Sequence, residues 1–176
     1  MNIQFTVYQI PKPKLESKSR AIKRRKKNGE IGTTTMQYKA TKQKKNEMKI
    51  MGILDLHKPE IPLDVALMLT VQAFLPMPKY IYSTWRREPA EAGIIRPPVK
   101  PDLSNLIKFI EDCMKQSGYF RDDSLIVQYG DNIGKWYSVN PRWEIKLTEI
   151  WQPRTKKEYD AFRAEYGNEN RALRHR

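Results

Sequence analysis

The chain has 176 residues, of which 33 are Lys or Arg and 20 are Asp or Glu, giving a formal net charge of +13. Hydrophobic residues make up 39%, and a chain of this length can bury a full core in one domain. Its single cysteine, Cys113, excludes an internal disulfide framework and a cysteine-cluster zinc site, and favours a reducing compartment. No run of about 18 apolar residues occurs and no secretory signal pattern opens the chain, so we expect no membrane partner and a cytoplasmic location.

The positive charge lies outside one nearly neutral segment. Residues 1–99 carry 19 basic and 8 acidic side chains, residues 100–150 carry 7 and 8, and residues 151–176 carry 7 and 4. Basic regions around an acidic pocket suit a polyanionic ligand, although a positive surface can also serve solubility alone. The size of the excess favours a nucleic-acid partner.

The first elements are a strand and a basic segment. Alternating apolar and polar residues predict a strand over 2–10, which Pro11 and Pro13 end. Residues 12–27 hold nine basic residues and little apolar material, so we predict a flexible arm or long loop over 12–30. A solvated loop without a ligand is the alternative. The candidate nucleic-acid contacts in it are Lys23, Arg24, Arg25, Lys26 and Lys27.

The middle of the chain predicts a helix, a strand and a loop. Residues 38–56 have apolar anchors among lysines, which is typical of an amphipathic helix, and the apolar run 63–75 predicts a central strand. Four prolines within 79–101 predict a loop without a regular element. Trp85 beside arginines suits contact with nucleic acid, and a Trp85 packed under its own loop is an equally good interpretation. The candidate contacts here are Arg86, Arg87 and Lys100.

The clearest helix signal covers residues 103–117, where Leu, Ile and Met recur on one face. Asp102 or Ser104 can cap its start, and Gly118 suits a left-handed end. Strands over 124–129 and 135–139, with a turn between them, are expected to form a hairpin, and 143–150 predicts a last strand. We therefore predict an α+β fold, with a mixed sheet of about four or five strands and two main helices. It forms one domain over 1–150, and 151–176 is a polar, basic extension with weak helical character.

Polar residues at both ends of this helix are candidates for phosphodiester chemistry. Ser104 and Lys108 fall on the face opposite the apolar stripe. Asp122 and Asp123 are adjacent, and two carboxylates about 4 Å apart repel by roughly 4 kcal/mol at an effective dielectric near 20. Mg²⁺ relieves such repulsion and can activate water against a phosphodiester. Spacing alone still favours structural roles, with Asp102 as a helix cap, the two aspartates in a turn and Lys108 paired within its helix.

The stretch KPDLSNLIKFIEDCMKQSGYFRDD, followed by a strand, Lys135 and a final strand, resembles the RusA family of Holliday-junction resolvases. The order of elements fits over residues 1–150. The resemblance implies an endodeoxyribonuclease of a bacterial or phage-infected cell that acts as a homodimer on four-way DNA junctions and makes paired, symmetric nicks in recombination and repair. It implies Asp102, Lys108 and Asp123 as catalytic residues. It also implies Asp102, Asp122 and Asp123 as ligands of Mg²⁺, with Mn²⁺ as a substitute and no small-molecule cofactor.

Ser104 stands where the family motif has its second aspartate. A hydroxyl is a weaker metal ligand than a carboxylate, although it can orient a metal-bound water or cap the helix. This departure motivates an alternative function, a non-catalytic protein of the same fold that binds branched DNA. Composition alone also permits an RNA-binding protein, which leaves the acidic residues unexplained.

Overall fold

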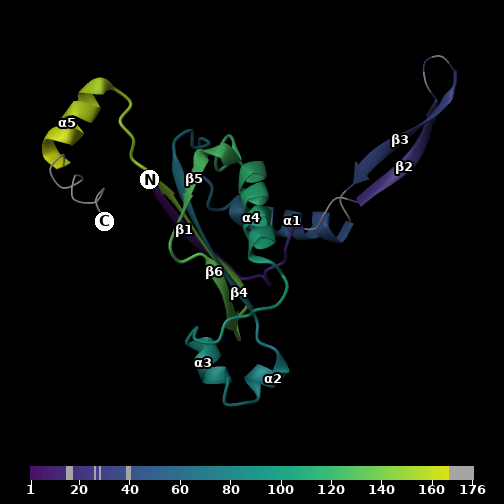
Figure 1. The fold of residues 1–176 in the computed structure, drawn as a ribbon, viewed down its shortest axis with the longest axis horizontal. Coiled ribbons are helices and arrows are strands. Elements are labelled where there is room, and N and C mark those ends of the chain that lie inside the picture. The colour runs from purple at the N-terminus through teal and green to yellow at the C-terminus, as the bar shows by residue number, and fades with distance from the viewer. Residues whose placement is uncertain (15–17, 26, 28, 39–40, 167–176) are drawn as a thin grey trace.

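The computed structural model describes residues 1–14, 18–25, 27, 29–38 and 41–166 (Figure 1). Its strands are β1 (Asn2–Val7), β2 (Lys18–Arg25), β3 (Ile31–Tyr38), β4 (Leu67–Pro76), β5 (Ile126–Tyr129), β6 (Gly134–Ser138) and β7 (Arg142–Glu149). Its helices are α1 (Thr41–Leu54), α2 (Lys79–Tyr82), α3 (Arg87–Glu91), α4 (Leu103–Ser117) and α5 (Lys156–Tyr166), with a short 3₁₀ turn at Asp123–Leu125. None of the helices in these ranges is both long and apolar enough to cross a lipid bilayer.

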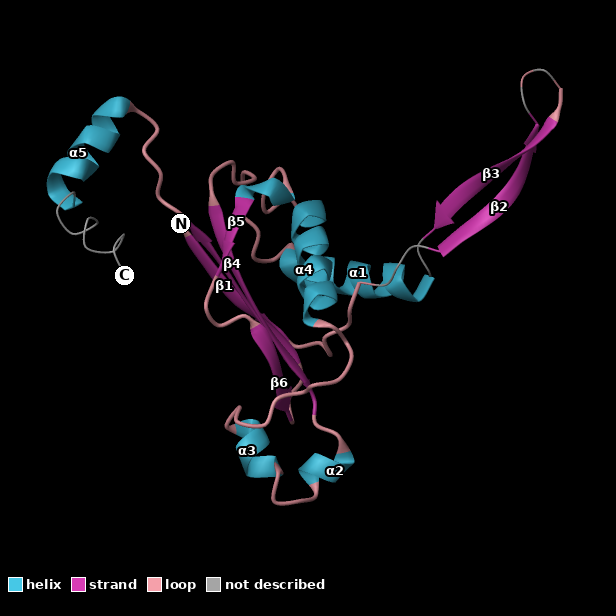
Figure 2. Ribbon diagram, in the orientation of Figure 1, coloured by secondary structure: helices cyan, strands magenta, loops and turns pink. Residues whose placement is uncertain are grey.

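Five strands form one mixed sheet, and β4 lies at its centre (Figure 2). β7 pairs antiparallel with β1 on one side and with β4 on the other. Both β5 and β6 run parallel to β4 along its free edge, β5 beside its first residues and β6 beside its last. The predicted α+β class, the mixed sheet and the two main helices, α1 and α4, are confirmed.

One face of the sheet carries the hydrophobic core. Alternate residues of β4 are buried, and Phe5, Val7, Trp143, Ile145 and Leu147 extend the same apolar surface across β1 and β7. The intervening β4 residues are only half-buried, which is the alternation expected of a sheet packed on one side. α1 and α4 supply the other half of this core.

α4 forms where the apolar spacing predicted it. Leu106, Phe109, Ile110, Cys113 and Met114 are buried against the sheet and α1. Removing one such large side chain typically costs about 2–5 kcal/mol, so the position of α4 is firmly held. Gly118 ends the helix with φ +82°, a left-handed conformation that favours glycine.

The segment predicted as a flexible arm or loop over 12–30 is instead largely a strand, and that prediction was wrong. β2 and β3 form an antiparallel hairpin in continuous register, from Lys18 opposite Tyr38 to Arg25 opposite Ile31. Figure 1 shows this hairpin extending away from the five-stranded sheet. The prediction assumed that so highly charged a segment cannot form regular structure, because it cannot fill a core. A hairpin needs no core for its backbone hydrogen bonds, because its two strands pair with each other.

Two other predictions of local structure were also wrong. Residues 79–101 contain two short helices, α2 and α3, which form around and between the prolines. β5 and β6 do not pair as a hairpin, because both run parallel to β4 and lie one after the other along its edge. Both strands pair with β4, which is distant in the sequence, and turn signals within 124–139 could not reveal that pairing.

Candidate active site

The first group of predicted site residues lies at the N-terminal end of α4. Asp102 occupies the N-cap position, but its side chain makes no capping hydrogen bond and is exposed. Ser104 and Lys108, also exposed, lie one helical turn apart on the same face. Asp102 therefore stands at the predicted cap position, but its side chain does not cap the helix. Its carboxylate remains available to a ligand.

Lys135 of β6 holds the chain that leads into this end of α4. Its Nζ donates hydrogen bonds to the carbonyl oxygens of Val99 at 2.8 Å and Pro101 at 2.9 Å. These bonds join the central sheet to the residues just before Asp102, and they therefore restrict where its carboxylate can lie.

The second group lies at the C-terminal end of α4. Lys115 Nζ contacts Asp122 Oδ2 at 2.7 Å and Asp123 Oδ1 at 2.9 Å, so the two carboxylates converge on one positive charge. Asp122 also accepts a hydrogen bond from the backbone N–H of Ser124 at 3.0 Å. We call Asp122 and Asp123 the acidic pair. The repulsion expected between its members is relieved in this chain by Lys115.

The contact shifts the ionisation of both partners. Hydrogen bonding to Lys115, and then to Ser124, holds the pKa of Asp122 well below its usual value of 3.8. The same hydrogen bonds to Asp122 and Asp123 raise the pKa of Lys115 above 10.5. Asp122 and Lys115 are therefore both charged near neutral pH, and their contact is an ion pair.

The two groups stand at opposite ends of one helix. Lys115 follows Asp102 by 13 residues, which at about 1.5 Å per residue is about 20 Å along the axis. A magnesium ion lies about 2 Å from each ligand, and paired ions lie about 4 Å apart. The structure therefore does not bring Asp102 and Asp123 together within one chain. Among the described residues, no three His, Cys, Asp or Glu side chains are grouped to hold a metal ion.

Between the two ends, α4 presents a polar stripe that we define as Ser104, Lys108, Glu111 and Lys115. The spacing places these side chains on the exposed side of the helix. Glu111 accepts a hydrogen bond from Tyr129 of β5 at 2.6 Å. Asp112, beside the stripe, forms an ion pair with Lys14 at 2.6 Å and not with Lys108. Lys108 thus has no ion pair in the part of the chain described, and the predicted structural role for it is wrong.

The predicted nucleic-acid contacts lie on two separate parts of the surface. Lys23, Arg24 and Arg25 are exposed on β2, and Lys27 is exposed in the turn beyond it. Lys26 lies outside the described residues. Arg86, Arg87 and Lys100 are exposed around α3 and before α4. Trp85 is also exposed, so the interpretation that it packs beneath its own loop is wrong.

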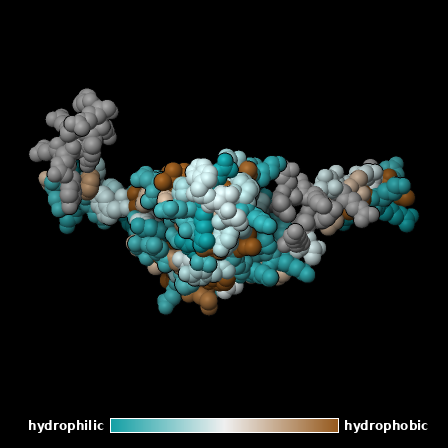
Figure 3. Space-filling model, turned by 90° about the horizontal axis from the view of Figure 1, so that it is seen from below, coloured by the Kyte–Doolittle hydropathy of each residue, from teal (hydrophilic) through white to brown (hydrophobic). Residues whose placement is uncertain are grey.

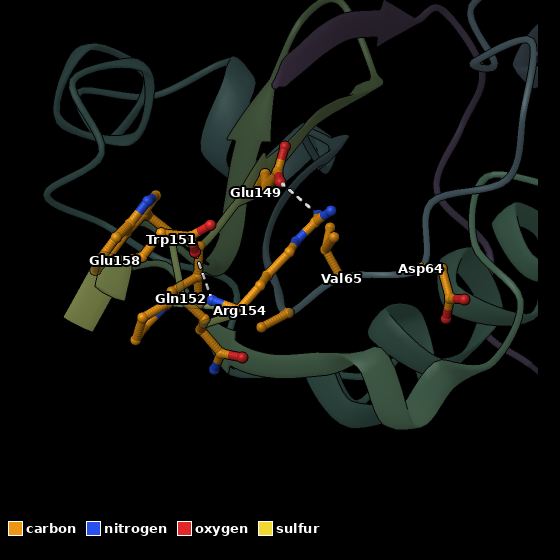
Figure 4. A pocket seen from close by; sticks show the side chains of 10 residues that line it. Asp64, Val65, Glu149, Trp151, Gln152, Arg154 and Glu158 are labelled. Carbon is orange, nitrogen blue, oxygen red and sulfur yellow. Dashed lines mark hydrogen bonds and ion pairs between the residues drawn. The ribbon is translucent and has the colours of Figure 1, made fainter. Parts of the chain in front are cut away.

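A cavity of about 520 Å³ lies elsewhere, between the start of β4 and the segment that follows β7 (Figure 4). Figure 4 shows Arg154 between Glu149 and Glu158. Glu149 contacts the terminal amine of Met1 at 3.0 Å, and Glu158 accepts a hydrogen bond from the backbone N–H of Arg154 at 2.7 Å. These charges are already partnered, and the cavity holds none of the predicted site residues.

Sequence reasoning missed the roles of Lys115, Lys135 and Lys14. Lys115 is near the end of α4, and the chain that turns at Gly118 carries the acidic pair back toward it. That signal was readable, because a left-handed glycine reverses the chain at a helix end. The contacts of Lys135 and Lys14 depend on tertiary packing, and no local pattern indicates them.

Comparison with known proteins adds two findings. The family described as endodeoxyribonuclease RusA matches residues 11–148, a range that includes both ends of α4 and the β2–β3 hairpin. A protein of Bacillus subtilis (strain 168), named "Uncharacterized protein YqaN", is 30% identical over 149 residues, which cover 84% of this chain and 96% of the relative.

Proposed function

Because the chain belongs to the RusA family of endodeoxyribonucleases, we propose that it resolves four-way DNA junctions by metal-dependent hydrolysis of phosphodiester bonds. The observation that carries this proposal is that exposed carboxylates stand at both ends of α4. Asp102 lies at its start, and the acidic pair lies beyond its end. Lysines lie near the carboxylates at both ends, and the chain as a whole is strongly basic. A positive surface attracts the negatively charged phosphates of a DNA substrate.

The proposed active site is shared between two chains. Two copies related by a two-fold axis through the polar stripe would place their α4 helices side by side and antiparallel. Asp102 of each chain would then lie beside Asp123 of the other, and the length of α4 would no longer separate them. A homodimer of this kind has two equivalent sites, which suits two symmetric cuts in a two-fold junction.

The acidic pair fits a divalent cation. Its two carboxylates already lie within 2.7 and 2.9 Å of a single cationic atom, Lys115 Nζ. Asp102, Asp122 and Asp123 would hold Mg²⁺ or Mn²⁺ through hard oxygen ligands, and the ion supplies activation of water and neutralisation of phosphate charge. Lys115 would release the pair when the ion binds. Ser104 would orient a water molecule, and Lys108 would stabilise the negative charge that develops on the phosphate.

Basic side chains on either side of this site would hold the DNA. Those of β2 and its turn would contact phosphates at a distance from the scissile bond, and those around α3 and before α4 would contact phosphates nearer to Asp102. The proposed contacts are Lys23, Arg24, Arg25, Lys26, Lys27, Arg86, Arg87 and Lys100.

A junction-cleavage assay tests the function. The full chain is incubated with a labelled four-way junction in Mg²⁺, in Mn²⁺ and in chelator, and nicked duplexes are expected only with a metal ion. Asp123→Asn should lose at least about 100-fold in cleavage rate while still binding the junction, because it removes a charged ligand at the reacting centre. Asp131→Asn, an exposed aspartate in the turn before β6, is the matched control and should cleave normally. Normal cleavage by Asp123→Asn would remove Asp123 from the site.

Ser104 supports a second candidate function, a branched-DNA-binding protein without cleavage. Its exposed hydroxyl occupies the first turn of α4, two residues after Asp102. This alternative predicts salt-sensitive junction binding without nicking in either metal ion. Ser104→Asp should then restore nicking, and a variant that binds the junction but stays inactive would count against this explanation.

A further inference from the structure

The end of the molecule nearest the start of α4 carries a small substructure that the proposed active site does not use. α2 and α3 follow β4, and Ile81, Ala90 and Tyr137 form a buried cluster that fixes both helices to β6. Met77 and Ile95 pack against this cluster. The segment between the two helices is therefore presented from a firm base.

That segment exposes two aromatic rings. Trp85 is 76% exposed and Tyr82 is 47% exposed. Each ring has an arginine over it, since Arg86 Cζ lies 5.6 Å from the centre of the Trp85 ring and Arg87 Cζ lies 4.5 Å from that of Tyr82. We call Tyr82, Trp85, Arg86 and Arg87 the aromatic platform. An exposed tryptophan on a firm base has no packing role, which points to a ligand.

The surroundings of the platform are basic. Residues 79–101 include five basic side chains, of which two belong to the platform, and two acidic ones. Figure 3 views the molecule from this end and shows residues of intermediate hydropathy beside strongly hydrophilic ones in the middle of the face. Positive charge combined with open aromatic rings is the surface on which nucleotide bases stack while their phosphates contact arginine.

We propose that the aromatic platform binds unpaired nucleotides of DNA, with a base stacked on Trp85 and the adjoining phosphate held by Arg86. The inference rests on the proposed function for the source of these nucleotides, which is DNA opened at a branch point. The chain runs from α3 directly to Asp102 at the start of α4, and Figure 1 shows α2 and α3 beyond this end of the sheet. Bases held on the platform would therefore lie on the side of the active site from which Asp102 projects.

Binding to single-stranded DNA tests the platform without requiring cleavage. The probe is a fluorescein-labelled oligothymidylate of about 12 nucleotides, within the usual range of single-strand site sizes, at a stated salt concentration. Its anisotropy is measured with wild-type protein, Trp85→Ala and Trp85→Phe. Trp85→Ala should weaken binding about 5- to 150-fold, the effect of removing one base-stacking interaction, and Trp85→Phe should restore most of it. Binding to a blunt duplex should not change.

Trp151→Ala is the matched control, because Trp151 is also exposed but its ring packs against that of Phe162 in a tilted arrangement. It should bind the oligonucleotide like wild type. Wild-type affinity of Trp85→Ala for the oligonucleotide would overturn the proposal. A change in the oligomeric state of Trp85→Ala, measured by light scattering, would also overturn it, because the ring would then be a contact between protein chains. If oligonucleotide binding needs Trp85 but the wild-type chain never cuts junctions, the proposal for the aromatic platform stands and the proposed nuclease function is wrong.

Discussion

Lys115 is the residue through which the charge of the candidate site is balanced. Its ammonium group contacts both carboxylates of the acidic pair, although all three side chains are exposed or half-exposed to solvent. Exposed ion pairs contribute little to stability on average, because water screens them. The effect of the contact is therefore local, and it holds the two carboxylates close together.

The ionisation of Asp122 reports on this contact directly. Its pKa is lower in the folded chain than the usual 3.8. The ionised carboxylate therefore stabilises the folded state at pH values above 3.8, and this contribution is lost as the pH falls through the folded-state pKa. Carboxyl ¹³C NMR should show Asp122 titrating below 3.8. Lys115→Met should move the midpoint back toward 3.8, because it removes the largest cause of the shift. Lys79→Met, a change on α2, is the control, and an unshifted Asp122 in wild type would contradict the contact.

We predict a different role for Lys135, which is to position Asp102 without touching DNA. Lys135→Met removes both hydrogen bonds to the chain before α4. We expect the cleavage rate at saturating junction to fall about 10- to 100-fold, with junction affinity kept within about twofold, because misplacing a reacting group affects the rate more than binding. Lys146→Met, a lysine on β7, should leave both unchanged. Equal losses in rate and affinity would show instead that Lys135 contacts the substrate.

At the scale of single residues, the spacing predicted which face of α4 is exposed, because the apolar stripe fixes which face is outward. The choice of Asp102 and the acidic pair as site residues came from the family resemblance, and it stays a prediction. The distance between the two acidic groups was also calculable from the helix length. What could not be predicted were partners from elsewhere in the chain, such as Lys14 for Asp112.

The β2–β3 hairpin is the element that bears most of the exposed positive charge near the N-terminus. Its register places Lys23, Arg24 and Arg25 opposite Thr33, Gly32 and Ile31. Side chains alternate between the two faces of such a ribbon, so its basic residues project from both. A two-stranded ribbon also fits the major groove of a DNA duplex.

Neutralising the ribbon should weaken binding to all DNA alike. The variant replaces Lys23, Arg24 and Arg25 by glutamine, and its affinity is measured for a junction and a duplex over a range of salt concentrations. The slope of log affinity against log salt should decrease by roughly 1 to 3, about one for each phosphate that the protein no longer neutralises. The matched control changes the neighbouring exposed residues Thr33, Thr34 and Thr35 to glutamine and keeps the charge. A loss confined to the junction would show that these side chains recognise its shape.

Elements with a local signal were predicted and elements with a distant partner were not. α4 and β4 followed from apolar spacing and from a continuous apolar run. β5 and β6 are short, and each takes its direction from β4, which lies more than 50 residues earlier in the chain. The hairpin was missed because its composition indicates disorder even though its 31–38 segment is rich in residues that favour strands.

At the scale of the whole molecule, the separation of the acidic groups along α4 is the reason for our proposal that activity requires a dimer. A mixing experiment tests it with Asp102→Asn and Asp123→Asn, each inactive alone. In a mixed dimer with shared sites, one site carries both substitutions and the other carries neither. Mixing should therefore restore single nicks without paired cuts. If mass spectrometry shows mixed dimers and no nicking appears, each site is formed within one chain.

The fold as a whole was predictable as a class, since one-sided strands and an amphipathic helix dictate a sheet covered on one face. The homodimer is expected from the family resemblance and not from residue patterns, because a polar stripe on a helix is also what ordinary solvent exposure produces. The length of α4 supports this proposal, because it separates Asp102 from the acidic pair within one chain.

None of the described residues of the β2–β3 hairpin belongs to the buried core. Substitutions at these residues therefore create no cavity in that core, so the ribbon can vary in sequence while the core remains constrained. If the ribbon contacts DNA as proposed, related proteins could acquire different DNA preferences by exchanging it as a unit. Protein engineers could likewise replace it with another DNA-binding segment and leave the sheet and its helices unchanged.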